Sequence, residues 1–170
     1  NEKTLRVIIK TSRPGIIIGR SGEGSTKLKN SITAFLRKLK VLVPEIKLDI
    51  EEIRSPESNA AIVAYMVAEG LEKRMPFRRV LKQTIEKVMA NRDVKGVRIG
   101  LAGMLGSGSM SRREELKKGR IPLQTFRSDI DYAKERANLP LGVIGVKVWI
   151  YKGEVFAADK KEKNKYCSIK

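Results

Sequence analysis

The amino-acid sequence predicts an α+β protein made of two folded units and a basic tail. Between residues 4 and 156, apolar residues recur at strand spacing in some segments and at helix spacing in others. The order is strand, helix, helix, strand over residues 1–54, whereas residues 55–156 begin with two helices and continue with strands. Residues 157–170 are polar and rich in lysine, a composition typical of a disordered segment.

Residues 1–54 show the pattern of a βααβ unit. Alternating apolar residues predict strands at Thr4–Lys10 and around Ile46–Ile50. Between them, Pro14 suits the first turn of a short helix. A long amphipathic helix should begin at Glu23 and end before Pro44, because its apolar residues fall at helical spacing: Leu28, Ile32, Phe35, Leu36 and Leu39.

Residues 55–156 predict two helices packed on a mixed or antiparallel sheet. Ser55-Pro56-Glu57 has the cap, proline and acidic residue of a helix start, and a second apolar stripe runs over Val80–Met89. The short connection between these helices favours antiparallel packing. Strands are expected at Val94–Ala102, Arg120–Tyr132 and Gly142–Val155, with a flexible Gly/Ser loop at 103–109 and a turn at 138–142.

Charge and composition restrict the classes of function. Lys and Arg total 36 against 19 Asp and Glu, and the net charge of +17 favours a polyanionic partner, nucleic acid before an anionic membrane. The chain has no histidine and one cysteine, Cys167, which excludes Ser-His-Asp and Cys-His catalysis and the usual zinc sites. We expect no metal and no cofactor. No apolar run approaches the roughly 20 residues that cross a bilayer, and no signal peptide is evident, so we expect a soluble cytoplasmic protein.

Gly19, Arg20, Ser21 and Gly22 form a GxxG sequence between the two helices of the first unit. The glycines let the backbone approach a sugar-phosphate chain closely, and the N–H groups that open the next helix favour phosphate. Flanked by strands, this arrangement is that of a KH module, which grips about four nucleotides. Arg20 is expected to contact a phosphate and Ser21 to make a smaller polar contact. Ile16–Ile18 either line the side where bases lie or belong to the core.

Two more basic clusters are candidate phosphate contacts. Arg78, Arg79 and Lys82 lie within about one helical turn, so their charges can point into a common channel. The second cluster lies beside the Gly/Ser loop and consists of Arg112, Arg113, Lys117, Lys118 and Arg120. A solvated surface is the alternative for both clusters. Four Phe, four Tyr and one Trp are few, so a grip on the nucleic-acid backbone is favoured over successive base stacking.

Asp129 and Asp131 are the remaining residues that could bind a metal or take part in catalysis. Two carboxylates separated by one residue project to the same side of a strand, where they could bind a divalent metal or serve acid–base chemistry. No further residue completes such a site in the sequence. Salt bridges to nearby arginines are therefore the favoured interpretation, and a metal-dependent nuclease is the alternative.

Several motifs, in order, resemble one protein family. They are Arg13-Pro14-Gly15-Ile16-Ile17-Ile18-Gly19, Phe77-Arg78-Arg79, Gly119-Arg120-Ile121-Pro122-Leu123, Asp129-Ile130-Asp131-Tyr132 and Gly142-Val143-Ile144-Gly145-Val146-Lys147-Val148-Trp149-Ile150. Together they closely resemble small-subunit ribosomal protein three of the bacterial type, roughly over residues 4–155. The resemblance implies a type II KH domain followed by a family-specific α+β domain. In the family, an N-terminal extension, a helix and a strand come before the position at which this sequence begins, so we expect the KH domain here to lack its N-terminal elements.

The resemblance also implies a function. Members of the family lie in the head of the small ribosomal subunit and contact small-subunit rRNA, neighbouring head proteins and messenger RNA. The segment Gly19–Gly22 matches the family's GxxG. Arg78, Arg79 and Lys82 match the basic helix residues that the family places where messenger enters and uses to unwind structured messages. We therefore expect a structural RNA-binding protein that is not an enzyme, with a nuclease and a free-standing KH regulator of messenger RNA as alternatives.

Overall fold

A computed structural model describes residues 4–39, 45–106 and 110–156 of the chain. Two compact units, Asn1–Arg54 and Ser55–Lys170, make up the chain. Several sequence predictions lie outside the described residues: those for Pro44, for residues 107–109 of the Gly/Ser loop, for the tail at 157–170 and for Cys167.

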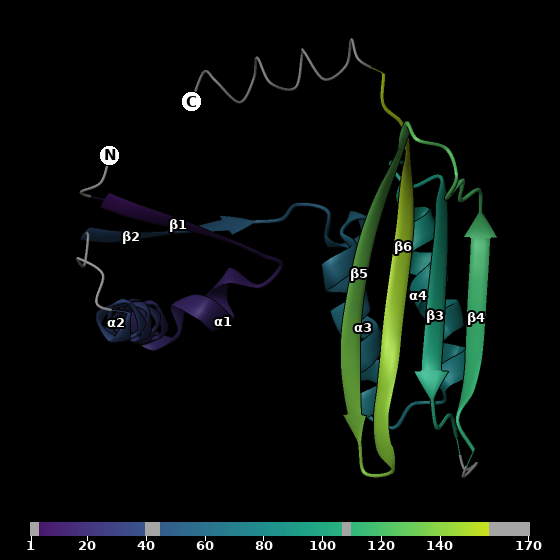
Figure 1. Ribbon diagram of the computed structural model, residues 1–170, viewed down its shortest axis with the longest axis horizontal. Coiled ribbons are helices and arrows are strands. Elements are labelled where there is room, and N and C mark those ends of the chain that lie inside the picture. The colour runs from purple at the N-terminus through teal and green to yellow at the C-terminus, as the bar shows by residue number, and fades with distance from the viewer. Residues whose placement is uncertain (1–3, 40–44, 107–109, 157–170) are drawn as a thin grey trace. The chain divides into compact units, whose positions relative to one another are not determined.

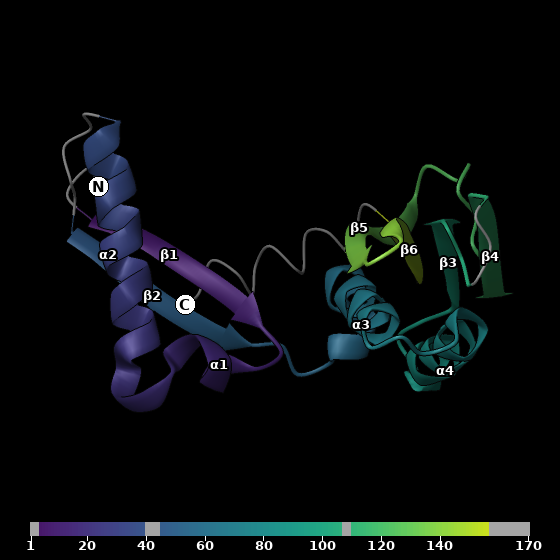
Figure 2. The same cartoon turned by 90° about the horizontal axis from the view of Figure 1, so that it is seen from below.

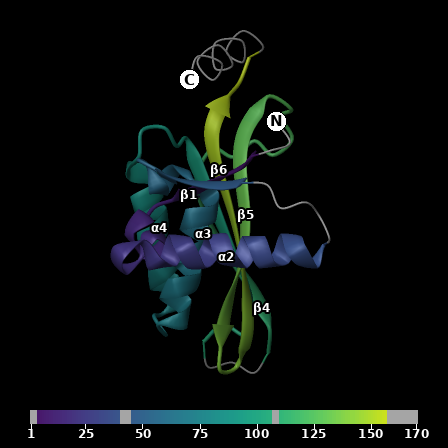
Figure 3. The same cartoon turned by 90° about the vertical axis from the view of Figure 1, so that its left-hand side faces the viewer.

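The first unit has the predicted order of strand, helix, helix, strand (Figure 1). Its elements are β1 (Thr4–Thr11), α1 (Pro14–Ile18), the 3-10 turn η1 (Arg20–Gly22), α2 (Glu23–Lys38) and β2 (Glu45–Glu52). β1 and β2 are parallel, from Thr4 opposite Glu45 to Thr11 opposite Glu52. Parallel strands need a long crossover, which α1 and α2 supply. Figure 3 shows α2 as one uninterrupted helix.

The apolar stripe predicted for α2 is present, but none of its residues is buried. Phe35, for example, remains 62% exposed. Among the described residues of this unit, Ile46 on β2 is the single buried apolar side chain. The reason is size, because a two-stranded sheet offers too little surface to cover a helix of 16 residues.

The second unit is a four-stranded antiparallel sheet with two helices on one face. Its elements are the 3-10 turn η2 (Pro56–Ser58), α3 (Ala60–Glu72), α4 (Phe77–Ala90), β3 (Gly96–Gly103), β4 (Arg112–Gly119), β5 (Ser128–Leu139) and β6 (Gly142–Glu154). The strand order is β4-β3-β6-β5. Figure 2 views the strands nearly end on and shows α3 and α4 on the same side of the sheet. The predicted α+β class, with two helices packed on an antiparallel sheet, is confirmed.

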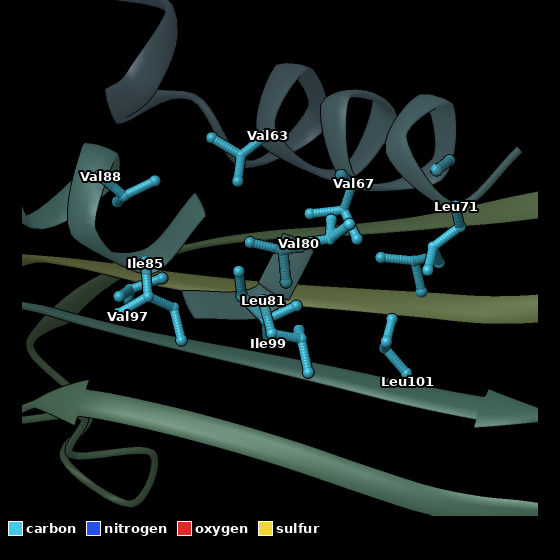
Figure 4. Close-up of a cluster of buried hydrophobic side chains, with 14 of the residues drawn as sticks. Val63, Val67, Leu71, Val80, Leu81, Ile85, Val88, Val97, Ile99 and Leu101 are labelled. Carbon is cyan, nitrogen blue, oxygen red and sulfur yellow. The ribbon is translucent and has the colours of Figure 1, made fainter. Parts of the chain in front are cut away.

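The core of the second unit lies between its helices and its sheet. Figure 4 shows side chains of α3, α4 and β3 pointing toward one another: Val63, Val67, Leu71, Val80, Leu81, Ile85, Val88, Val97, Ile99 and Leu101. β6 adds the buried residues Ile144, Val146, Val148 and Ile150. Successive side chains of a strand point to opposite faces, so the residues between these lie on the face that neither helix covers. We call that uncovered face the open face.

The helix start predicted at Ser55-Pro56-Glu57 is displaced. These residues open η2, in which the Ser55 and Ser58 hydroxyls lie 2.9 Å apart, instead of opening a helix. The cap of α3 is Asn59, whose Oδ1 accepts a hydrogen bond from Ala61 N at 3.0 Å. Ser55 and Asn59 are both residue types that commonly cap helices, and the sequence alone does not show which of them begins α3.

Two strands also differ from the prediction. Residues 120–127, expected to begin a strand, form a connection that contains Pro122, and β5 begins at Ser128. β4 was not predicted, because Leu116 is the one apolar residue in its otherwise charged sequence. β4 is an edge strand and needs few apolar residues. The predicted turn at 138–142 is the hairpin connection Pro140-Leu141 between β5 and β6.

We predict that Gly96→Ala lowers the free energy of unfolding of the second unit by about 1–3 kcal/mol, the usual range for an overpacked core. A Cβ on Gly96 would overlap the carbonyl oxygen of Arg120, a backbone atom that cannot move without displacing the chain beside β3. The matched control is Gly100→Ala on the same strand, where the Cβ would lie 3.7 Å from the Trp149 ring and 4.0 Å from Glu115 Cβ. Urea unfolding of the two variants checks this, and equal losses would contradict it.

Candidate nucleic-acid interface

The GxxG segment forms the junction between α1 and α2. Gly19 has φ 69° and ψ −174°, a backbone conformation that is almost confined to glycine, and Gly22 has φ 80°. Ser21 also takes a left-handed conformation, with φ 51°. Gly19, Arg20 and Ser21 are exposed and Gly22 is half-buried. The junction therefore presents backbone with little side-chain cover, as close contact with a sugar-phosphate chain requires.

The N-terminus of α2 is open to a ligand for a second reason. Its N-cap is Gly22, which has no side chain to accept hydrogen bonds from the first amides of the helix. The hydroxyls of Ser25 and Thr26 donate to the Gly22 carbonyl oxygen, at 2.8 and 3.1 Å, and so do not occupy those amides. Glu23 in the first turn opposes an anion there, although Lys27 lies 3.7 Å from its carboxylate.

A third glycine holds this junction together and was missed in the sequence. A Cβ at Gly24 would overlap the carbonyl oxygen of Ile17, so α1 and α2 are in backbone contact at this point. The sequence signal is the spacing Gly19-x-x-Gly22-x-Gly24, in which the last glycine serves helix packing. Ile16 and Ile18 are exposed and Ile17 is half-buried, so these isoleucines are not core residues.

Arg78, Arg79 and Lys82 lie on the exposed side of α4. The opposite side of the helix buries Val80, Leu81, Thr84, Ile85 and Val88 against the sheet and α3. At 100° per residue, Lys82 falls between the two arginines, within an arc of about 100°. The packing of α4 therefore directs all three cationic side chains to solvent on one side.

The aromatic ring of Phe77 joins this helix to β4. The Arg78 guanidinium carbon lies 5.6 Å from the ring centroid and that of Arg112 lies 5.7 Å from it, both within cation–π range. Arg112 also donates to the Leu105 carbonyl oxygen at 3.0 Å, and Arg78 lies 3.8 Å from Glu114. One residue of each predicted cluster, Arg78 and Arg112, thus meets at the Phe77 ring at the start of α4.

The second basic cluster does not form one patch. Lys118 stands opposite Val97 in the register and so shares the helix-covered side of the sheet, as does Arg112. Arg113 and Lys117 stand opposite Ala102 and Arg98 on the open face. Arg120 follows the strand, and its backbone N–H donates to the Lys95 carbonyl oxygen at 3.3 Å. The two-residue period of a strand divides a run of cations between two surfaces.

Asp131 has a structural role in the second unit. Its Oδ2 accepts a hydrogen bond from Ala60 N, at the start of α3, at 3.1 Å and lies 3.2 Å from Lys152 Nζ. The expected partner type was arginine, and the partner is a lysine. A bulge separates Asp129 from Ile130, so the regular alternation that would align Asp129 with Asp131 is broken. Within the described residues, no group of three or more His, Cys, Asp or Glu could hold a metal ion.

Across the described parts of the chain, no helix has the length and apolar content to cross a bilayer.

Comparison with known proteins finds matches to both units. A family model described as a KH domain matches residues 1–58, and one described as the C-terminal domain of ribosomal protein S3 matches residues 67–150. Curated relatives with the name small ribosomal subunit protein uS3 include one from Endomicrobium trichonymphae, 48% identical over 94% of this chain and 66% of its own length. Another, from Pseudomonas aeruginosa (strain UCBPP-PA14), is 44% identical over 94% of this chain and 67% of its own length. The chain spans about two thirds of the length of these relatives.

We predict that Asp131→Asn lowers the free energy of unfolding of the second unit by about 1–2 kcal/mol, because it weakens both a helix cap and an ion pair. Asp129→Asn is the matched control and should change it by less than about 0.5 kcal/mol, as a substitution without such contacts does. Thermal unfolding of both variants checks the difference. A larger loss for the Asp129 variant would show that the cap is not the important contact.

Proposed function

The chain belongs to the family of small ribosomal subunit protein uS3, and from this we propose that α4 lines the channel through which messenger RNA enters the small subunit. As a member of this family, the chain is a structural component of the ribosome in the cytoplasm, and it is not an enzyme. Its KH domain makes it an RNA-binding protein. The proposed channel role goes beyond what family membership shows, and it depends on how α4 presents its cations.

The observation that carries the proposal is the arrangement of α4. Arg78, Arg79 and Lys82 share one exposed arc, and the Arg78 side chain is 73% exposed despite its contact with Glu114. Cations on long side chains, presented by a helix that the core holds in place, can follow a phosphate backbone without reading its sequence. Such contacts suit a messenger whose sequence changes at every step.

The same cations favour unpaired over paired messenger in the channel. Translocation pulls the message and opens its structure for a short time, and phosphate contacts with α4 then stabilise the separated strands. A ligand shifts an equilibrium only through its different affinity for the two states, and here that difference comes from holding single strands. No chemical step is required, which agrees with a structural protein.

The GxxG junction is proposed to hold RNA backbone, with Gly19 and Gly22 as points of close approach and Arg20 as a phosphate contact. The support is the exposed left-handed backbone at Gly19 and Ser21, together with the uncapped start of α2.

Small-subunit rRNA and neighbouring proteins of the subunit head are the other partners proposed for the chain. Arg112 is proposed to orient Phe77 and Arg78, while Arg113, Lys117, Lys118 and Arg120 remain candidate rRNA contacts.

We predict that replacing Arg78, Arg79 and Lys82 together by alanine slows translation through a stable messenger hairpin while unstructured messages are read at a nearly normal rate. The fold should persist, because all three positions are exposed and alanine favours helix. In RNA binding, the log–log salt slope should fall by up to about 0.7 for each single-strand phosphate that the variant no longer neutralises. The measurement is single-turnover translation by reconstituted small subunits on the two messages.

The control removes three cations from elsewhere in the same unit: Lys73→Ala, Lys87→Ala and Arg92→Ala. With this control variant, the rate of translation of the hairpin message relative to that of the unstructured message should not change. If the Arg78, Arg79 and Lys82 variant slows both messages equally, the defect lies in assembly and the channel role is wrong.

A further inference from the structure

The open face of the second unit carries a row of side chains across all four strands, and those on β3, β6 and β5 stack on one another. Lys117 on β4 stands opposite Arg98 on β3, Arg98 opposite Trp149 on β6, and Trp149 opposite Tyr132 on β5. The Arg98 guanidinium carbon lies 5.0 Å from the Trp149 ring, and the Trp149 and Tyr132 ring centroids lie 5.3 Å apart at 37°. Figure 1 looks onto this face, with α3 and α4 behind the strands.

The row is held in place from the β4 side. Arg98 donates to Glu115 Oε2 at 2.6 Å, and its side chain is only 23% exposed. The hydrogen bond from Arg98 lowers the pKa of Glu115 and keeps that carboxylate charged. Arg98 is therefore fixed between Glu115 and the Trp149 ring. At the other end of the row, Tyr132 remains 48% exposed, so its ring is available to a further planar group.

Three cations lie on the same face as these rings. Lys134 stands directly opposite Lys147 in the β5–β6 register, and Arg136 follows on the same face. Like charges directly opposite one another destabilise a sheet. Within the described residues, none of the three has an ion pair. Of the acidic residues at strand positions of this face, Glu115 is already bound to Arg98 and Arg113, and Asp129 stands opposite Gly153, five residues along β5 from Lys134.

We propose that the open face is a second RNA-binding surface, which stacks an unpaired base on Tyr132 and holds the adjoining phosphates with Lys134, Lys147 and Arg136. An unfavourable pair of lysines next to an exposed aromatic ring is explained by a ligand that has both negative charge and flat apolar surfaces. Single-stranded RNA has both, whereas an acidic peptide lacks the flat rings. Gly100, Ala102 and Gly145 lie among these residues in the register, so no large side chain projects from the middle of the surface.

This proposal rests on the RNA-binding role of the chain and is independent of the channel role of α4. The α4 cations lie on the helix side of the sheet, and the open face is the other side. Each surface can therefore fail alone in an experiment.

The single tryptophan of the chain is Trp149, so its fluorescence reports on this face specifically. The test titrates the full chain with a 12-nucleotide single-stranded adenylate RNA, a length of about three KH footprints. We expect saturable quenching. Lys134→Gln with Lys147→Gln should weaken the binding that quenching reports and reduce its salt slope by about 1.4, two phosphates at 0.7 each. Tyr132→Leu should weaken it about fivefold or more, the lower end for base stacking.

Two matched variants make the outcome decisive. Lys87→Gln with Arg92→Gln removes the same charge elsewhere and should leave the quenching titration nearly unchanged. The Arg78, Arg79 and Lys82 alanine variant should also retain it, which separates this surface from the channel.

The proposal is overturned if RNA leaves Trp149 fluorescence unchanged, or if the Lys134 and Lys147 variant binds RNA as tightly as the Lys87 and Arg92 control. Equal quenching by a glutamate peptide of the same charge would overturn the assignment to RNA and indicate a protein partner. Melting temperatures of the lysine variants that are no lower than that of the unsubstituted chain show that weaker binding is not a failure to fold, and removal of the opposed Lys134 and Lys147 charges should raise the value slightly.

Discussion

The packing of α3 and α4 on one face of the sheet determines on which side the charged residues of α4 and of the strands lie. Val80, Leu81 and Ile85 on α4 meet Val97, Ile99 and Leu101 on β3, and this burial fixes the rotation of the helix about its axis. With that rotation fixed, Arg78, Arg79 and Lys82 can only face solvent. The same burial assigns the alternate residues of β3 and β6 to the open face. A loss of this packing would therefore remove both proposed RNA surfaces together.

β4 connects the two surfaces through adjacent residues. Glu114 points to the helix side, where it lies 3.8 Å from Arg78, and Glu115 points to the open face, where it binds Arg98 at 2.6 Å. Glu114 pairs with Arg78 alone, whereas Glu115 pairs with Arg98 and also with Arg113, at 3.6 Å. Within the described residues, Arg79, Lys82, Lys134 and Lys147 have no ion pair, and all four are proposed phosphate contacts.

The sequence predicted those features that depend on neighbours in the chain. The exposed arc of Arg78, Arg79 and Lys82 follows from helical spacing, and the turn at Gly19–Gly22 follows from its glycines. It did not predict β4, in which charged residues surround Leu116, because an edge strand lacks the apolar alternation that reveals a strand. Nor could it predict the contact of Asp131 with the start of α3, which depends on how α3 packs on the sheet, or the stacking of Tyr132 on Trp149, which depends on the register of β5 with β6. These contacts are set by tertiary pairing.

A position of α4 beside messenger RNA, with its exposed side facing the message, is tested most directly by cross-linking. Gln83 is exposed next to Lys82 and can carry a photoreactive benzophenone side chain without touching the core. In reconstituted small subunits with a bound message, irradiation should cross-link position 83 to messenger RNA, and a message too short to reach the channel should give no such product. Cross-links to rRNA or protein alone, with both lengths of message, would contradict the channel role.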